Sequence, residues 1–222
     1  MFPGPRASKY HVDQGSADAK TGGPTRPDLR GTIILKHIDP DGTIWEYSVQ
    51  KALLYRFFQF TQRTLDTNPA ITIIDLGSND EYRVTSEAIL YVYNRIVAWT
   101  ILEQGSDKGL IEKEDNHTSA QCLQVYQAAL LLDIPYYYLN HLHSYIFDYF
   151  GDTVLSVAEL CAVVDTFPLD CVVVACMISD MNAHYRKRHL YLVDWDVIIA
   201  FVRSNQELNT RFDDDYRGLN RS

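Results

Sequence analysis

The sequence predicts an α+β fold with a small β-sheet and a predominance of helices, and three observations support this class. Segments with the β-branched or alternating pattern of strands are few and come early, at 32–38, 43–49 and 70–76. From residue 86 onward, apolar residues recur at spacings of three and four, which is typical of amphipathic helices. Of the 222 residues, 46% are hydrophobic and 22% are charged, an ordinary balance for a packed chain.

Residues 1–29 differ in composition from the rest of the chain. They hold four of the eight prolines and four of the eleven glycines, and almost no aliphatic residues. Because such a segment buries too little apolar surface to offset the entropy lost on ordering, we expect a flexible arm. A linear recognition motif within the arm is the alternative.

The fold is expected to begin with a β-hairpin. The runs 32–38 and 43–49 are joined by the letters D-P-D-G at 39–42, and Asp-Gly is a strong turn signal. A calcium loop is the competing interpretation of these aspartates, but the remaining oxygen ligands and the Glu at loop position 12 are missing. The turn interpretation is therefore preferred.

The hairpin is followed by an alternation of helices and one strand. A helix is predicted over 50–65, and Pro69 ends it because the residue before a proline disfavours the helical region. The strand 70–76 comes next, and a second helix is expected over 86–99. Residues 103–118 are polar and contain glycine, so we expect a surface loop there.

The remainder of the chain is predicted to be helical. A helix capped by Thr118 or Ser119 runs to Leu132, and Pro135 opens the next helix, which Gly151 ends. Three more helices are expected from apolar rows near 157–164, 172–177 and 197–202, the last two capped by Asp170 and Asp194.

Charge and cysteine content limit the classes of partner and compartment. Twenty Lys and Arg stand against 29 Asp and Glu, a net charge of −9, which argues against direct nucleic-acid binding and against a polybasic membrane surface. No apolar run reaches the roughly 18 residues of a membrane span, so we expect no membrane partner. The four cysteines are too few and too irregular for a disulfide framework, which favours buried thiols in the cytoplasm or the nucleus.

The chain lacks the motifs that assemble a catalytic or cofactor site. It has no glycine-rich phosphate loop, no nucleophile elbow and no H-E-x-x-H zinc motif. His141 and His143 lie two apart on a predicted helix and therefore point to different faces. We expect no catalytic residue, no metal site and no cofactor; an enzyme that uses His141, His143 or His184 with nearby carboxylates is the alternative. The cations at 186–188 are interpreted as charge at a helix C-terminus, with an anion site as the alternative.

Tyr136, Tyr137 and Tyr138 are the candidate partner-binding residues. At the start of a helix, three consecutive tyrosines cannot all face inward, so at least one should be exposed. Exposed aromatic residues are enriched at partner surfaces. Ordinary packing with the hydroxyl groups at the rim is the alternative.

Several segments carry a resemblance to a known family. Residues 49–54 read V-Q-K-A-L-L and lead into aromatics up to Phe60, and residues 88–96 read A-I-L-Y-V-Y-N-R-I. Residues 123–135 read L-Q-V-Y-Q-A-A-L-L-L-D-I-P, which is similar to the pattern L-x-x-A-x-x-L-x-I-P. With the strand at 73–76, these segments resemble the BTB/POZ domain family, and the hairpin resembles that of the related Skp-type and elongin-C-type cullin adaptors.

The resemblance implies a small sheet capped by helical hairpins over 30–150, between the arm 1–29 and a helical extension at 151–204. Residues 205–222 are polar and are expected to fray as a tail. The function implied is that of a non-enzymatic protein–protein interaction module, a substrate adaptor for a cullin ubiquitin ligase that also forms a homodimer. A nuclear co-regulator scaffold tethered through the arm is the alternative role.

Overall fold

The computed structural model describes residues 27–78, 83–102, 111, 113, 114 and 116–219. It confirms the α+β class, because a three-stranded sheet is followed by a long series of helices. The predicted arm at 1–29 and the predicted loop at 103–118 lie mostly outside the described residues.

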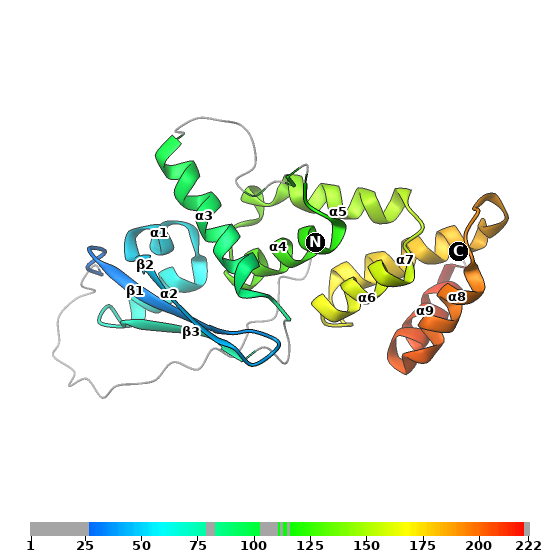
Figure 1. Cartoon of the computed structure of the whole chain (residues 1–222), viewed down its shortest axis with the longest axis horizontal. Helices are drawn as coiled ribbons and strands as arrows, with labels where there is room; N and C mark the ends of the chain where they lie inside the picture. The colour runs from blue at the N-terminus through cyan, green and yellow to red at the C-terminus, as the bar shows by residue number, and fades with distance from the viewer. Residues whose placement is uncertain (1–26, 79–82, 103–110, 112, 115, 220–222) are drawn as a thin grey trace.

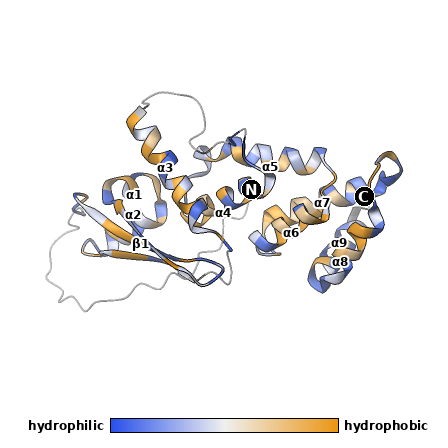
Figure 2. Ribbon diagram, viewed as in Figure 1, coloured by the Kyte–Doolittle hydropathy of each residue, from blue (hydrophilic) through white to orange (hydrophobic). Residues whose placement is uncertain are grey.

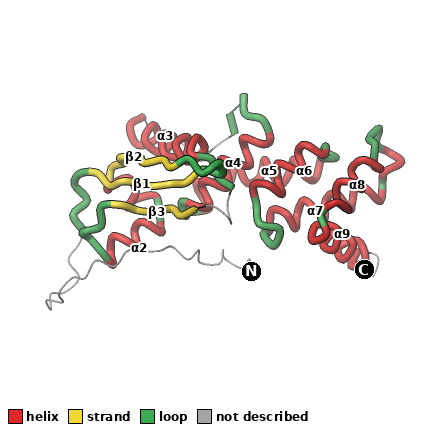
Figure 3. Tube along the Cα trace, turned by 60° about the horizontal axis from the view of Figure 1, so that its bottom comes forward, coloured by secondary structure: helices red, strands yellow, loops and turns green. Residues whose placement is uncertain are grey.

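The sheet is built from the predicted hairpin and one later strand. Strands β1 (Thr32–Ile38) and β2 (Ile44–Gln50) pair antiparallel, and β3 (Ile73–Ser78) pairs parallel with β1, which gives the order β2-β1-β3. Figure 3 shows the three strands side by side. Successive side chains of a strand point to opposite faces, so Ile33 and Leu35 of β1 lie in the core. The opposite face of the sheet is half-exposed and carries the Lys36–Asp75 ion pair (Nζ to Oδ2, 3.3 Å).

The single helix predicted over 50–65 is wrong, because the structure has two helices there. Helix α1 (Lys51–Phe57) and helix α2 (Gln59–Thr67) are separated at Phe58, whose backbone is extended (φ −113°, ψ 103°). Phe58 is buried, and the next amide donates to the carbonyl of Asp133 (3.1 Å). Core packing and a long-range hydrogen bond thus outweigh the local helical pattern.

The other elements follow the sheet towards one end of an elongated molecule (Figure 1). They are α3 (Ser86–Leu102), α4 (Ser119–Leu131), η1 (Tyr136–Tyr138), α5 (Asn140–Asp152), α6 (Val157–Thr166), α7 (Val172–Arg186), η2 (Arg188–Leu190), α8 (Trp195–Ser204) and α9 (Gln206–Leu219). The caps at Thr118 and Asp194 are confirmed, since each side chain accepts from the first turn of its helix. The Asp170 cap is wrong, because Cys171 occupies that position without a side-chain bond.

Fraying of the polar tail is also wrong for residues 206–219, which form α9. Leu208 and Phe212, four residues apart, are buried among polar neighbours, and α9 packs on both α7 and α8. The side chain of Asn182 on α7 donates to the carbonyl of Phe212 (2.9 Å) and to the Asp215 carboxylate (3.0 Å). Leu208 and Phe212 thus lie about one turn apart on the face of α9 that packs against the extension.

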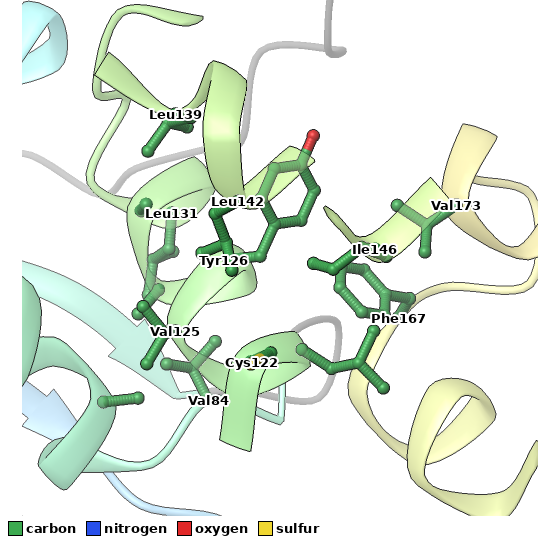
Figure 4. Close-up of a cluster of buried hydrophobic side chains, with 14 of the residues drawn as sticks. Val84, Cys122, Val125, Tyr126, Leu131, Leu139, Leu142, Ile146, Phe167 and Val173 are labelled. Atoms are coloured by element: carbon green, nitrogen blue, oxygen red, sulfur yellow. The ribbon is translucent and has the colours of Figure 1, made fainter. Parts of the chain in front are cut away.

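One continuous core joins the sheet-bearing part to the helical extension. Figure 2 shows hydrophobic residues both in the sheet and in the helices that follow it. Helix α4 packs against α3, α5 and α6, and most of its residues are buried. Figure 4 shows this contact region, where side chains of α4 meet those of α5 and of the α6–α7 segment, among them Cys122, Tyr126, Leu142, Ile146 and Phe167.

Hydrogen bonds to Glu159 connect helices α4, α5 and α6. Its carboxylate accepts from the Ser156 amide (2.8 Å) and hydroxyl (2.7 Å), which completes a capping box at the start of α6. It also accepts from the hydroxyl groups of Tyr149 on α5 and Ser119 on α4. The cavity left beside it is only about 10 Å³.

Removal of this carboxylate is expected to destabilise the fold. We expect Glu159→Ala to lower the free energy of unfolding by about 2–3 kcal/mol, because a cap and charge-assisted hydrogen bonds are lost together. Urea denaturation measures the change. Glu159→Gln retains part of the hydrogen bonding, so its free energy of unfolding should fall by less. If Glu159→Ala lowers the free energy of unfolding no more than a surface substitution does, this structural role is contradicted.

The same carboxyl group should contribute to the pH dependence of stability. Burial alone would raise the pKa of Glu159, but hydrogen bonds from Tyr149, Ser156 and Ser119 outweigh it and hold the pKa below its ordinary value of 4.5. A lowered pKa in the folded state stabilises the protein above pH 4.5, and this stabilisation is lost as the pH falls through the folded pKa. Below pH 4.5 the wild type should therefore lose stability more steeply than Glu159→Gln; equal slopes in denaturation at each pH would contradict this.

Candidate partner-binding surface

The three consecutive tyrosines form η1, a 3₁₀ turn between α4 and α5. Successive side chains of such a turn, with three residues per turn, point in three directions. Tyr136 and Tyr137 are 57% and 63% exposed, whereas Tyr138 is half-buried against the core. The prediction that the three cannot all face inward is confirmed. We call the exposed rings of Tyr136 and Tyr137 the tyrosine surface.

The backbone before the turn is held by contacts from α2. Asp133 adopts a left-handed conformation (φ 53°) that ends α4, and the Ile134 amide closes the end by donating to the carbonyl of Ala129 (3.0 Å). The carboxylate of Asp133 pairs with Arg63 of α2, and its carbonyl accepts from the Gln59 amide. These contacts hold the backbone in place directly before Tyr136 and Tyr137.

A platform of packed aromatic rings supports Tyr137. Its ring lies 4.0 Å, centroid to centroid, from the ring of Tyr138, which in turn contacts Phe57 (5.6 Å) and Trp99 (6.1 Å). The guanidinium of Arg56 lies over the Phe57 ring (5.1 Å). Burial, together with a hydrogen bond to Tyr137, raises the pKa of Tyr138 to about 12. The Tyr137 ring is thus exposed on one side and packed against Tyr138 on the other.

Tyr136 rests on a second cluster, centred on His143. The edge-on contact between these two rings is 4.9 Å, and His143 stacks on Phe147 (4.1 Å). The Nδ1 atom of His143 shares a hydrogen bond with the Tyr126 hydroxyl (2.7 Å). Burial lowers the pKa of His143, which favours the neutral imidazole. His141 is exposed, so the prediction that the two histidines point to different faces is confirmed.

The structure brings together a serine, a histidine and an aspartate that the sequence did not single out as a group. Asp39 accepts from the Ser86 amide (2.7 Å) and hydroxyl (2.9 Å) and from the indole nitrogen of Trp45 (2.7 Å). His37, fully buried, donates from Nε2 to the Val84 carbonyl (2.9 Å). The Ser86 hydroxyl is thus buried and hydrogen-bonded. Asp39 and His37 together connect the hairpin to the start of α3. Asp39 and Ser86 are 47 residues apart in the sequence, so local pattern did not reveal their contact. Asp39 therefore has a second role besides its place in the turn.

His184, the other histidine of the enzyme alternative, serves as a link between elements. Its Nε2 atom donates to the carbonyl of Phe150 on α5 (3.1 Å), and its Nδ1 atom accepts from the Tyr191 hydroxyl (2.8 Å). It lies in the last turn of α7. The lining residues of the cavity beside Glu159, and of a larger groove between α7, α8 and α9, do not include His141, His143 or His184.

Within the described residues, no group of three or more His, Cys, Asp or Glu side chains is placed to hold a metal ion. No described helix has both the length and the apolar character needed to cross a membrane. No protein-family model, curated protein or solved structure matches the chain. A function therefore has to be proposed from the residues themselves.

Proposed function

We propose that this chain is a protein–protein interaction module of the BTB/POZ type that acts as a substrate adaptor for a cullin ubiquitin ligase. The observation that carries the proposal is the tyrosine surface, which directly follows the segment 123–135 that most resembles the family. The second resembling segment, 49–60, supplies Arg56 and Phe57 of the supporting platform. One resembling segment thus ends directly before the tyrosine surface, and the other packs beneath it.

The physical properties of this surface suit a binding role. Tyrosine offers a large apolar ring with a polar hydroxyl group, and it loses little conformational entropy on binding because it has only two side-chain torsions. Here the rings of Tyr136 and Tyr137 already rest on His143 and Tyr138, so part of this entropy has been lost on folding. A pre-organised pair of aromatic residues is the type of group that dominates interface energetics.

Binding to a cullin is tested by titration calorimetry of the full chain against the N-terminal domain of a BTB-binding cullin. The proposal predicts saturable one-to-one binding with a micromolar or lower dissociation constant. A folded, soluble sample that releases no heat of binding would remove the ligase role, and the partners of the tyrosine surface would then be sought elsewhere.

Homodimer formation is a separate expectation from the same resemblance. Light scattering of the full chain over a range of concentrations should give twice the chain mass of 25.5 kDa. A strict monomer at the highest concentration would contradict the homodimer while leaving the proposed cullin contact in place.

A further inference from the structure

Strand β2 forms one edge of the three-stranded sheet (Figure 3). In an antiparallel pair, alternate residues of a strand turn their N–H and C=O groups towards the partner strand and away from it. The Lys51 amide, directly after β2, donates to the Gly31 carbonyl (3.1 Å). The Thr43 carbonyl, directly before β2, accepts from the Asp39 amide (2.8 Å). Odd-numbered residues of β2 therefore bond to β1, and even-numbered residues turn their backbone groups outwards.

Three residues of this edge, Ile44, Glu46 and Ser48, offer unpaired backbone groups. Their side chains are exposed, and nothing in the described part of the chain hydrogen-bonds to their outward amides and carbonyls. At the end of the strand, the Gln50 amide donates to the Tyr93 hydroxyl of α3 (3.4 Å), so the edge ends there. An exposed row of unpaired N–H and C=O groups is a template for pairing with another strand.

The opposite edge of the sheet, strand β3, is irregular. Its pairing with β1 shifts register between Lys36 and Ile38, and Gly77 has a left-handed backbone (φ 86°). The Asp75 carboxylate accepts from the Gly77 amide (2.9 Å). Irregularities of this kind protect an edge against pairing. Strand β2 pairs with β1 without a register shift and contains neither proline nor glycine, so it is the better suited of the two edges.

The sequence of β2 is self-complementary in antiparallel pairing with a second copy. Outward-facing residues pair with outward-facing residues, so the registers nearest the middle of the strand are centred on Glu46, Tyr47 or Ser48. The first register places Glu46 opposite Glu46 of the second copy, and like charges in that position are destabilising. The third shortens the overlap. The register centred on Tyr47 overlaps all seven residues and places Glu46, the strand's one charged residue, opposite Ser48.

We propose that two copies of this chain join through β2, paired antiparallel about a two-fold axis at Tyr47, so that their sheets become one continuous sheet. The proposal rests on the homodimer expected under the proposed function and names its interface. Ile44, Glu46 and Ser48 supply the backbone hydrogen bonds. The Ser48 hydroxyl of each copy donates to the Glu46 carboxylate of the other, so the side-chain contact is made twice.

Sedimentation equilibrium of the full chain measures the dissociation constant of the dimer, which we expect in the micromolar range. Ser48→Glu places two pairs of like charges across the interface and should weaken the dimer at least about fivefold. Ser48→Lys places a cation opposite Glu46 at the same two points and should tighten it. Ser48 is exposed, so both variants should fold, and thermal unfolding verifies this. Thr72→Glu adds the same charge at an exposed position beside β3, and this matched control should leave the dimer unchanged.

Amide hydrogen exchange above and below the dissociation constant gives an independent test. In the dimer, exchange should slow at the amides of Ile44, Glu46 and Ser48. A full chain that stays monomeric at the highest concentration would overturn both the interface and the homodimer. A dimer with the same dissociation constant in Ser48→Glu and Ser48→Lys, or one that leaves these three amides unprotected, would overturn the interface alone. The double variant Tyr136→Ala, Tyr137→Ala should dimerise like the wild type, so failure here is distinguishable from failure of the cullin contact.

Discussion

Replacement of both exposed tyrosines, Tyr136→Ala with Tyr137→Ala, is expected to weaken cullin binding at least about 100-fold. Aromatic residues at the centre of an interface each contribute about 2 kcal/mol or more, and these two rings make up the tyrosine surface. Stability should change by less than about 1 kcal/mol, because both side chains are mostly exposed. Calorimetry measures the affinity, and thermal unfolding measures the stability.

Two control variants sharpen this prediction. Tyr136→Phe with Tyr137→Phe keeps the rings and removes the hydroxyl groups, so a small loss assigns the binding energy to ring burial. Leu192→Ala truncates another exposed apolar side chain, beyond η2, and should leave cullin affinity unchanged. Wild-type affinity in the double alanine variant would show that the partner binds elsewhere.

Phe57→Ala is expected to have the largest effect on stability, lowering the free energy of unfolding by about 3–5 kcal/mol. Phe57 is fully buried and contacts Trp99 and Tyr138 (5.7 and 5.6 Å between centroids), so truncation leaves a cavity and separates two aromatic neighbours. Guanidinium denaturation at neutral pH gives the change. The expected loss is a large share of the roughly 5–15 kcal/mol that stabilises a typical domain.

Phe57→Leu serves as the milder variant if the alanine variant does not fold. It keeps most of the apolar volume and should cost about 1–2 kcal/mol. A loss below about 1 kcal/mol for Phe57→Ala would contradict its place in the platform.

Local chemistry made much of the fold predictable from the sequence. β-Branched and alternating residues located the three strands, the third of which lies at 73–78 rather than at the predicted 70–76. The caps at Thr118 and Asp194 follow from side chains that satisfy free amides of the first helical turn. The break at Phe58 was missed because it depends on burial and on a hydrogen bond to Asp133, which are long-range effects. Helix α9 was missed because its polar composition hid the pair Leu208 and Phe212.

The candidate sites differ in the same way. Three consecutive tyrosines after a proline are visible in the sequence, and the 3₁₀ turn that exposes two of them is a local structure. The groove between α7, α8 and α9 was not predictable, because its lining residues lie on different elements and come together only through the packing of these helices. The sequence had suggested only helix-end charge at 186–188, with an anion site as the alternative.

The central claim, that the tyrosine surface is where this chain binds a cullin, is tested most directly by amide hydrogen exchange. The full chain would be compared with and without a saturating amount of the cullin N-terminal domain. The account predicts slower exchange at residues 134–143, which span η1 and the first turn of α5, with little change in α8 and α9. Binding that leaves exchange at 134–143 unchanged, or that protects only other elements, would contradict it.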